Sequence, residues 1–95
     1  MAAEEELGHK ITQNTLSITN EQIVEMYHGS KILSAQFYKG LSIILYTLSN
    51  TESGKGFRKI FIYETDEIID TKKDKTYITT VYDSFYKAYH IFEEK

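Results

Sequence analysis

The chain has 95 residues, with 14 acidic and 11 basic side chains and a net charge of −3, and it contains no cysteine, proline or tryptophan. Its length fits one domain, and 41% hydrophobic with 26% charged residues is the composition of a folded globular chain rather than a disordered one. The lack of cysteine excludes disulfides, thiolate metal sites and a cysteine nucleophile, while the lack of a long apolar run excludes a transmembrane helix.

The N-terminal third predicts an acidic tail, a short strand and a helix. Residues 1–10 are small and acidic, lack the pattern of a signal peptide, and are expected to form the flexible tail of a cytoplasmic protein. Residues 15–18 alternate apolar with polar side chains and predict a short strand. Thr19 and Gln22 then fit a capping box, with a hydroxyl at the cap and an amide three residues later, which predicts a helix over residues 20–27.

The middle of the chain predicts the strands of one antiparallel sheet. Residues 31–38 alternate apolar with polar side chains, and Lys39 with Gly40 fits a tight hairpin turn, because glycine readily adopts positive φ. Further β-branched and aromatic runs predict strands over residues 41–49, 57–65 and 76–82.

The C-terminal segment predicts an amphipathic helix. Ser84 is a suitable N-cap, and four apolar residues follow at helical spacing, namely Phe85, Ala88, Tyr89 and Phe92. The expected fold class is therefore α+β, with a single antiparallel sheet of four to five strands, a short N-terminal helix and a C-terminal amphipathic helix. These elements are expected to form one domain over residues 11–95.

The two central strands are apolar on both faces, whereas a half-exposed sheet alternates apolar with polar residues. Either each predicted helix covers one face, or both helices cover one face and a partner subunit covers the other. The surplus of tyrosine favours the second arrangement, because aromatic residues are enriched at protein interfaces. The sequence therefore predicts a homodimer that also contacts another protein. The candidate interface residues are Tyr46, Leu48, Phe61, Tyr63, Tyr82 and Tyr86.

An alternative function is the binding of single-stranded nucleic acid. Residues 31–75 carry eight basic and six acidic side chains, so the centre of the chain is mildly basic although the whole chain is acidic. Basic loops beside sheet tyrosines often hold single strands. The candidate residues are Lys39, Lys55, Arg58, Lys59, Lys72, Lys73, Lys75 and Tyr63. The antiparallel strands, the segment Gly54-Lys55-Gly56-Phe57-Arg58-Lys59-Ile60 and the aromatic helix from Ser84 resemble Whirly-type single-strand binders over about half of the chain, without a diagnostic motif.

No motif in the sequence predicts catalysis. Residues 53–56 lack the spacing of a phosphate-binding loop, and the three histidines lack the spacing of metal ligands. The acidic cluster Glu64, Asp66, Glu67 and Asp70 lacks the calcium-loop pattern, and a carboxylate metal site there is the third hypothesis. The main prediction is a small non-enzymatic binding protein without a cofactor or metal. Its lysine-rich, arginine-poor composition suits a regulator or inhibitor from a low-GC microbe, plasmid or virus.

Overall fold

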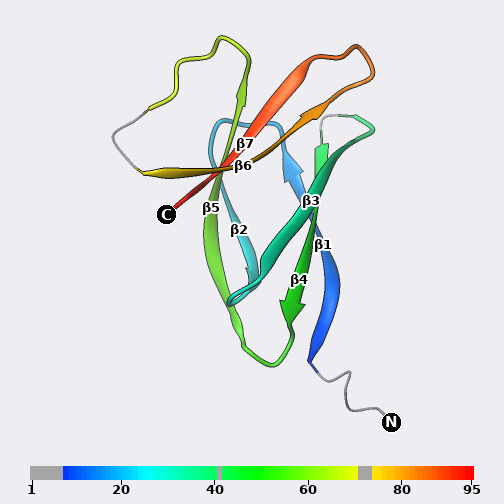
Figure 1. Ribbon diagram of the computed structural model, residues 1–95, viewed down its shortest axis with the longest axis vertical. Coiled ribbons are helices and arrows are strands. Elements are labelled where there is room, and N and C mark those ends of the chain that lie inside the picture. Colours follow the sequence, from blue (N-terminus) through cyan, green and yellow to red (C-terminus); the bar gives the residue numbers. More distant parts are fainter. Residues whose placement is uncertain (1–7, 41, 71–73) are drawn as a thin grey trace.

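Seven strands in the described part of the chain form two antiparallel sheets that face each other (Figure 1). The structure is a computed structural model that describes residues 8–40, 42–70 and 74–95. The first sheet has the order β1 (His9–Ser17), β4 (Ser42–Asn50) and β3 (Lys31–Tyr38). The second sheet has the order β2 (Gln22–Tyr27), β5 (Lys55–Glu64), β7 (Ala88–Glu94) and β6 (Lys75–Tyr82). Because none of the described residues is helical, the predicted α+β fold with a single sheet is wrong, and these residues form an all-β sandwich.

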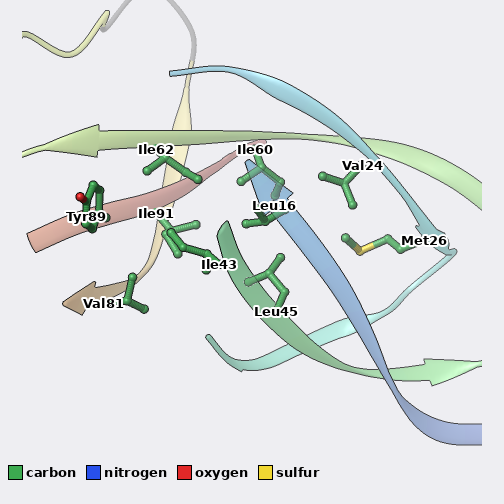
Figure 2. Close-up of a cluster of buried hydrophobic side chains, with 10 residues drawn as sticks. All are labelled: Leu16, Val24, Met26, Ile43, Leu45, Ile60, Ile62, Val81, Tyr89 and Ile91. Carbon is green, nitrogen blue, oxygen red and sulfur yellow. The ribbon is translucent and has the colours of Figure 1, made fainter. Parts of the chain in front are cut away.

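The hydrophobic core lies between the two sheets (Figure 2). Leu16, Ile43 and Leu45 point inward from the first sheet and meet Ile60 and Ile91 from the second sheet, and all five side chains are fully buried. The second sheet thus covers the inner face of β4. A second layer of strands, rather than a predicted helix, removes this apolar surface from water.

The outer face of β5 is apolar at its C-terminal end as well, and the chain itself covers this part. Phe61 and Tyr63 face away from the core, yet they are only 4% and 6% exposed. Lys75 Nζ lies 4.6 Å from the centre of the Phe61 ring, and Phe92 packs edge-on against Tyr63. Burial raises the pKa of the Tyr63 hydroxyl, and the nearby Asp70 carboxylate adds to this shift. Two of the residues predicted to lie in a subunit interface are therefore already buried within one chain.

The predicted helix over residues 20–27 is wrong, because most of this segment forms strand β2. Val24 and Met26 alternate into the core, and apolar residues on the opposite face conceal this period of two. Gln22, which the sequence places in a capping box, instead closes the turn between the two sheets. The Gln22 amide donates to the Ser17 carbonyl (2.6 Å) and accepts from the Ser17 N–H (3.1 Å). This side chain therefore bonds the end of β1 as a neighbouring strand would.

The predicted C-terminal helix from Ser84 is also wrong, because the segment forms a turn followed by β7. Asp83 is the capping residue, and its carboxylate closes a hairpin turn instead of starting a helix. Ile91 lies off the predicted helical stripe but is fully buried, whereas Phe85 begins that stripe and is 88% exposed. A segment with apolar residues on both faces fits either period, and the facing sheet selects the strand.

The remaining strand predictions are confirmed. β3, β4, β5 and β6 lie where the sequence predicts them, and Gly40 in the β3–β4 turn has a φ of 77°. β1 is longer than expected and begins at His9, inside the predicted tail, while residues 1–7 and Leu41 lie outside the described residues. The described residues include no helix long and apolar enough to cross a membrane.

One end of the interior is polar. Thr12 Oγ1 lies 2.7 Å from Thr47 Oγ1 and 2.9 Å from Ser49 Oγ, and Ser49 lies 3.0 Å from Ser30 Oγ. The Ser30 hydroxyl in turn donates to the Tyr27 carbonyl at 2.7 Å. Burying a hydroxyl is costly unless it is hydrogen-bonded, and this network bonds each of these four hydroxyls to a neighbour.

Candidate partner-binding groove

Two hairpin turns lie next to each other at one end of the sandwich, at the upper right of Figure 1. One joins β3 to β4, and the other joins β6 to β7. Between them lies a groove of about 670 Å³. It is lined by Phe37, Tyr38, Lys39, Gly40, Tyr82, Asp83, Ser84, Phe85 and Tyr89. Five of these nine residues are aromatic, so the groove combines a mainly apolar lining with polar side chains, as ligand-binding clefts do.

The base of the groove is held by two stacked rings, one from each sheet. Phe37 of β3 and Tyr89 of β7 stack with their ring centres 5.6 Å apart and their planes 19° from parallel. The Tyr89 hydroxyl donates to Asp83 Oδ2 at 3.2 Å. Burial raises the pKa of Tyr89, and its bond to the Asp83 carboxylate adds to the shift. Because each ring belongs to a residue that is paired within its sheet, Phe37 with Ile43 and Tyr89 with Glu64, the base of the groove is formed before any partner binds.

The β6–β7 turn is fixed by the side chain of Asp83. Its Oδ1 accepts from the backbone N–H groups of Phe85 (2.8 Å) and Lys87 (3.0 Å), and the Tyr86 N–H donates to the Asp83 carbonyl (3.0 Å). Desolvation opposes ionisation of this carboxyl, but the hydrogen bonds to Lys87, Phe85 and Tyr89 outweigh it and lower the Asp83 pKa. An ionised Asp83 therefore holds the turn in one shape at neutral pH.

The turn presents two adjacent aromatic side chains to solvent. Phe85 is 88% exposed and Tyr86 is 86% exposed. Tyr86 also has a φ of 65°, in the left-handed region that glycine prefers and that is unfavourable for other residues. Neither ring stacks on another ring or carries a cation–π contact within the described residues. The two side chains therefore add little to folding, which makes them candidates for binding.

The structure brings together only two of the predicted interface residues. Tyr82 lines the groove, and Tyr86 lies in the turn beside it. Tyr46 and Leu48 lie on the outer face of the first sheet instead, while the other two are buried as described above. The sequence prediction missed the remaining aromatic lining residues. Helical spacing predicts that Phe85 and Tyr89 share one face of a helix, although Asp83 next to a serine is also typical of a turn between two strands.

The residues predicted to bind nucleic acid are dispersed. Lys39 lines the groove, whereas Lys55 lies at the far end of the sandwich, 5.0 Å from the centre of the Tyr27 ring. The Arg58 guanidinium forms a two-point ion pair with Glu93, which raises the Arg58 pKa.

The other predicted cations also have partners. Lys59 pairs with Glu21 at 3.2 Å and Glu94 at 3.8 Å, and Lys75 lies over Phe61. Tyr63 is buried, and Lys72 and Lys73 lie outside the described residues. The described members of the set therefore form no continuous basic surface.

The acidic cluster serves a turn after β5. Glu67 Oε1 accepts from the Glu64 N–H at 2.6 Å, and Glu67 Oε2 accepts from the Asn20 amide at 3.1 Å. These two hydrogen bonds, first that from Glu64, lower the Glu67 pKa. In the described ranges, no group of three or more histidine, aspartate or glutamate side chains is arranged to hold a metal ion.

The fold and the groove define a small β-sandwich with an aromatic cleft at one end. The chain belongs to the family described as Domain of unknown function (DUF7352), whose model matches residues 8–95. No curated protein and no solved structure matches the chain. Because the family description states no activity, function has to be inferred from the groove and its surroundings.

Proposed function

We propose that the protein is a small non-enzymatic binding protein that contacts another protein through the aromatic groove. The observation that carries the proposal is the pair Phe85 and Tyr86, 88% and 86% exposed on a turn that Asp83 holds rigid. In the cytoplasm, such a protein would act as a regulator or inhibitor of its partner. This role also gives a reason for keeping a tyrosine at a φ of 65°, where glycine would fold more easily.

The energetics of the groove support a protein partner. Aromatic residues dominate the few positions that supply most of the affinity at protein interfaces, and truncating such a residue typically costs about 2 kcal/mol or more. Phe85 and Tyr86 are already held in place, so binding loses little backbone entropy at the turn. The stacked Phe37 and Tyr89 give the partner a preformed apolar base on which to pack.

The charges in the groove define the partner further. Lys39 is the one lysine or arginine among the lining residues, and it lies 5.8 Å from the centre of the Tyr38 ring. The Asp83 carboxylate is occupied by the turn and by Tyr89. The groove therefore fits a segment with apolar side chains and an acidic group that can reach Lys39.

Nucleic-acid binding has weaker support. Exposed tyrosines in and beside the groove offer stacking surfaces, but among the described residues Lys39 is the single predicted cation that lines it. A single strand needs a charged path along its backbone as well as rings to stack on.

A peptide selection on the full chain tests the proposal. Random peptides are selected on the wild type, and their affinities are measured by fluorescence anisotropy for the wild type and for the Phe85→Ala/Tyr86→Gly double variant. We expect peptides with apolar and acidic residues that bind the double variant at least tenfold more weakly. Phe57→Ala is the matched control. Phe57 is likewise an exposed aromatic residue (74% exposed) near the start of β5, and it does not line the groove.

Three results would contradict the proposal. The selected peptides could bind the double variant as tightly as the wild type, or the control could lose as much affinity as the double variant. The third is a failure to select any peptide together with salt-sensitive binding of an oligothymidine, which would favour nucleic acid instead.

A further inference from the structure

The four edge strands of the sandwich differ in regularity. β3 and β6 each carry a register shift, between Ile32 and Ser34 and between Tyr77 and Thr79 respectively. Such bulges interrupt an edge and discourage further strands from adding to it. β1 instead pairs with β4 in unbroken register over nine residues, and the chain contains no proline. β1 is therefore the longest regular edge in the described part of the molecule.

Hydrogen bonds at its two ends show which residues of β1 face outward. The Ser17 N–H and carbonyl bond the Gln22 side chain instead of β4, while the Gly8 carbonyl accepts from the Thr51 N–H next to β4. Backbone groups alternate in direction along an antiparallel strand. The odd-numbered residues His9, Ile11, Gln13 and Thr15 therefore direct their N–H and carbonyl groups away from β4, where the described residues offer them no partner.

We infer that this edge pairs with β1 of a second copy, which joins the two three-stranded sheets into one six-stranded sheet. The pairing is antiparallel about a two-fold axis at Thr12. His9 then lies opposite Thr15 of the second copy, and Ile11 lies opposite Gln13. This inference goes beyond the proposed function, because it assigns the homodimer to a surface separate from the aromatic groove.

The free backbone groups select this register. Centring on Thr12 pairs all four outward-facing residues and forms about eight hydrogen bonds, two for each bonded pair. Shifting the centre to Gln13 would require Ser17, whose groups already bond Gln22. Shifting the centre to Ile11 would leave Thr15 unpaired. The Gln22 side chain thus ends the new ladder at the position where the Thr12 register needs it to end.

The side chains of β1 favour a second copy as the occupant. Its one lysine, Lys10, lies opposite Asn14 of the second copy, so like charges do not meet across the axis. Ile11 is 62% exposed in the single chain. In this register it becomes the diagonal neighbour of Ile11 of the second copy on the same face, so pairing covers an apolar side chain.

Cysteine cross-linking tests the register, because the chain has no cysteine of its own. Across the axis, Thr12 and its copy form a non-hydrogen-bonded pair with Cα atoms about 4.5 Å apart, within reach of a disulfide. A cleft of about 200 Å³ borders Thr12 and leaves room for the bridge. We expect Thr12→Cys to give a disulfide-linked dimer on mild oxidation. Asn14→Cys is the matched control, because its copy lies about 13 Å away, four residues along the strand.

Light scattering on the full chain tests the assembly without a cross-link. The wild type should have a mass of about 22 kDa, twice the 11.1 kDa of one chain. Gln13→Pro removes an outward N–H while keeping the β1–β4 bonds, so it should give the single-chain mass. Glu25→Pro is the matched control. The His28 N–H and the Asn20 carbonyl both bond the neighbouring chain on the β5 side. Glu25 lies an odd number of residues from each of them, so its N–H points away from β5. This variant should stay dimeric.

Several results would overturn the inference. They are a wild type of 11.1 kDa at all concentrations, a dimer that survives Gln13→Pro, or an Asn14→Cys chain that cross-links as fast as Thr12→Cys. Thermal unfolding shows whether each proline variant is folded. If one is unfolded, the comparison of Thr12→Cys with Asn14→Cys tests the inference in its place. The Phe85→Ala/Tyr86→Gly double variant should keep the dimer mass, so failure here and failure of the proposed function are distinguishable.

Discussion

Replacing Tyr86 with glycine should stabilise the protein, although it removes a large aromatic side chain. Tyr86 has a φ of 65°, and its side chain is almost fully exposed. A left-handed conformation costs an L-residue about 1–2 kcal/mol, mainly through the clash of its Cβ with the backbone. Glycine has no Cβ and avoids this cost. The substitution sacrifices almost no buried surface, because little of the ring is buried.

The opposing effect is the greater flexibility of glycine in the unfolded chain, which costs about 0.5–1 kcal/mol. The balance is a gain of about 0.5–1 kcal/mol in the free energy of unfolding. For a domain of this size, a gain of 1 kcal/mol raises Tm by about 4–8 °C. Tyr86→Ala keeps a Cβ at the same φ, so it should bring little of this gain.

Thermal and urea unfolding of the wild type, Tyr86→Gly and Tyr86→Ala measure the difference. The expected order of stability is glycine first, with alanine and tyrosine close together below it. The reasoning is refuted if Tyr86→Gly lowers the free energy of unfolding by more than about 1 kcal/mol, because Tyr86 would then make folding contacts. An equal gain for Tyr86→Ala would also refute it, because the gain would not come from backbone strain.

Two further predictions concern charged groups. Arg58→Ala should cost about 2–4 kcal/mol in urea unfolding, because it leaves the half-buried Glu93 carboxylate without its guanidinium. Lys87→Ala should cost clearly less, because its bridge to Glu64 is exposed to solvent. Equal costs would contradict this account. The Asp83 pKa is lowered from its ordinary value of 3.8 by folding, so its contribution is present above that pH and is lost as pH falls through the folded pKa. Asp83→Asn should therefore flatten the acid loss of stability below pH 3.8, and an unchanged acid slope would show that Asp83 does not supply it.

The sequence predicts those strands whose signals are local. Residues 31–38 and 76–82 alternate or are rich in β-branched side chains, and Gly40 marks the turn between β3 and β4. The two predicted helices fail where apolar residues occupy both faces of a strand. β2 and β7 each turn one face to the core and also carry an apolar residue on the other face, Ile23 and Phe92 respectively, so periods of two and of 3.6 both fit. Only the facing sheet, which local sequence does not reveal, decides between them.

The candidate site depends on long-range pairing. Phe37 and Tyr89 are 52 positions apart, and their stacking follows from the packing of one sheet on the other. The sequence nevertheless identifies Tyr82 and Tyr86 as surface aromatics. It could not show that Phe85 is exposed, because a helix starting at Ser84 would have placed that ring in the core.

The most direct test of the account compares Ile91→Ala with Phe85→Ala in urea unfolding. The last part of the chain is a hairpin that buries Ile91 and presents Phe85 to solvent. Ile91→Ala should then cost about 2–5 kcal/mol, while Phe85→Ala should change stability by about 0.5 kcal/mol or less. The reverse order, with a large loss for Phe85→Ala and a small one for Ile91→Ala, would indicate a C-terminal helix and would contradict both the sandwich and its groove.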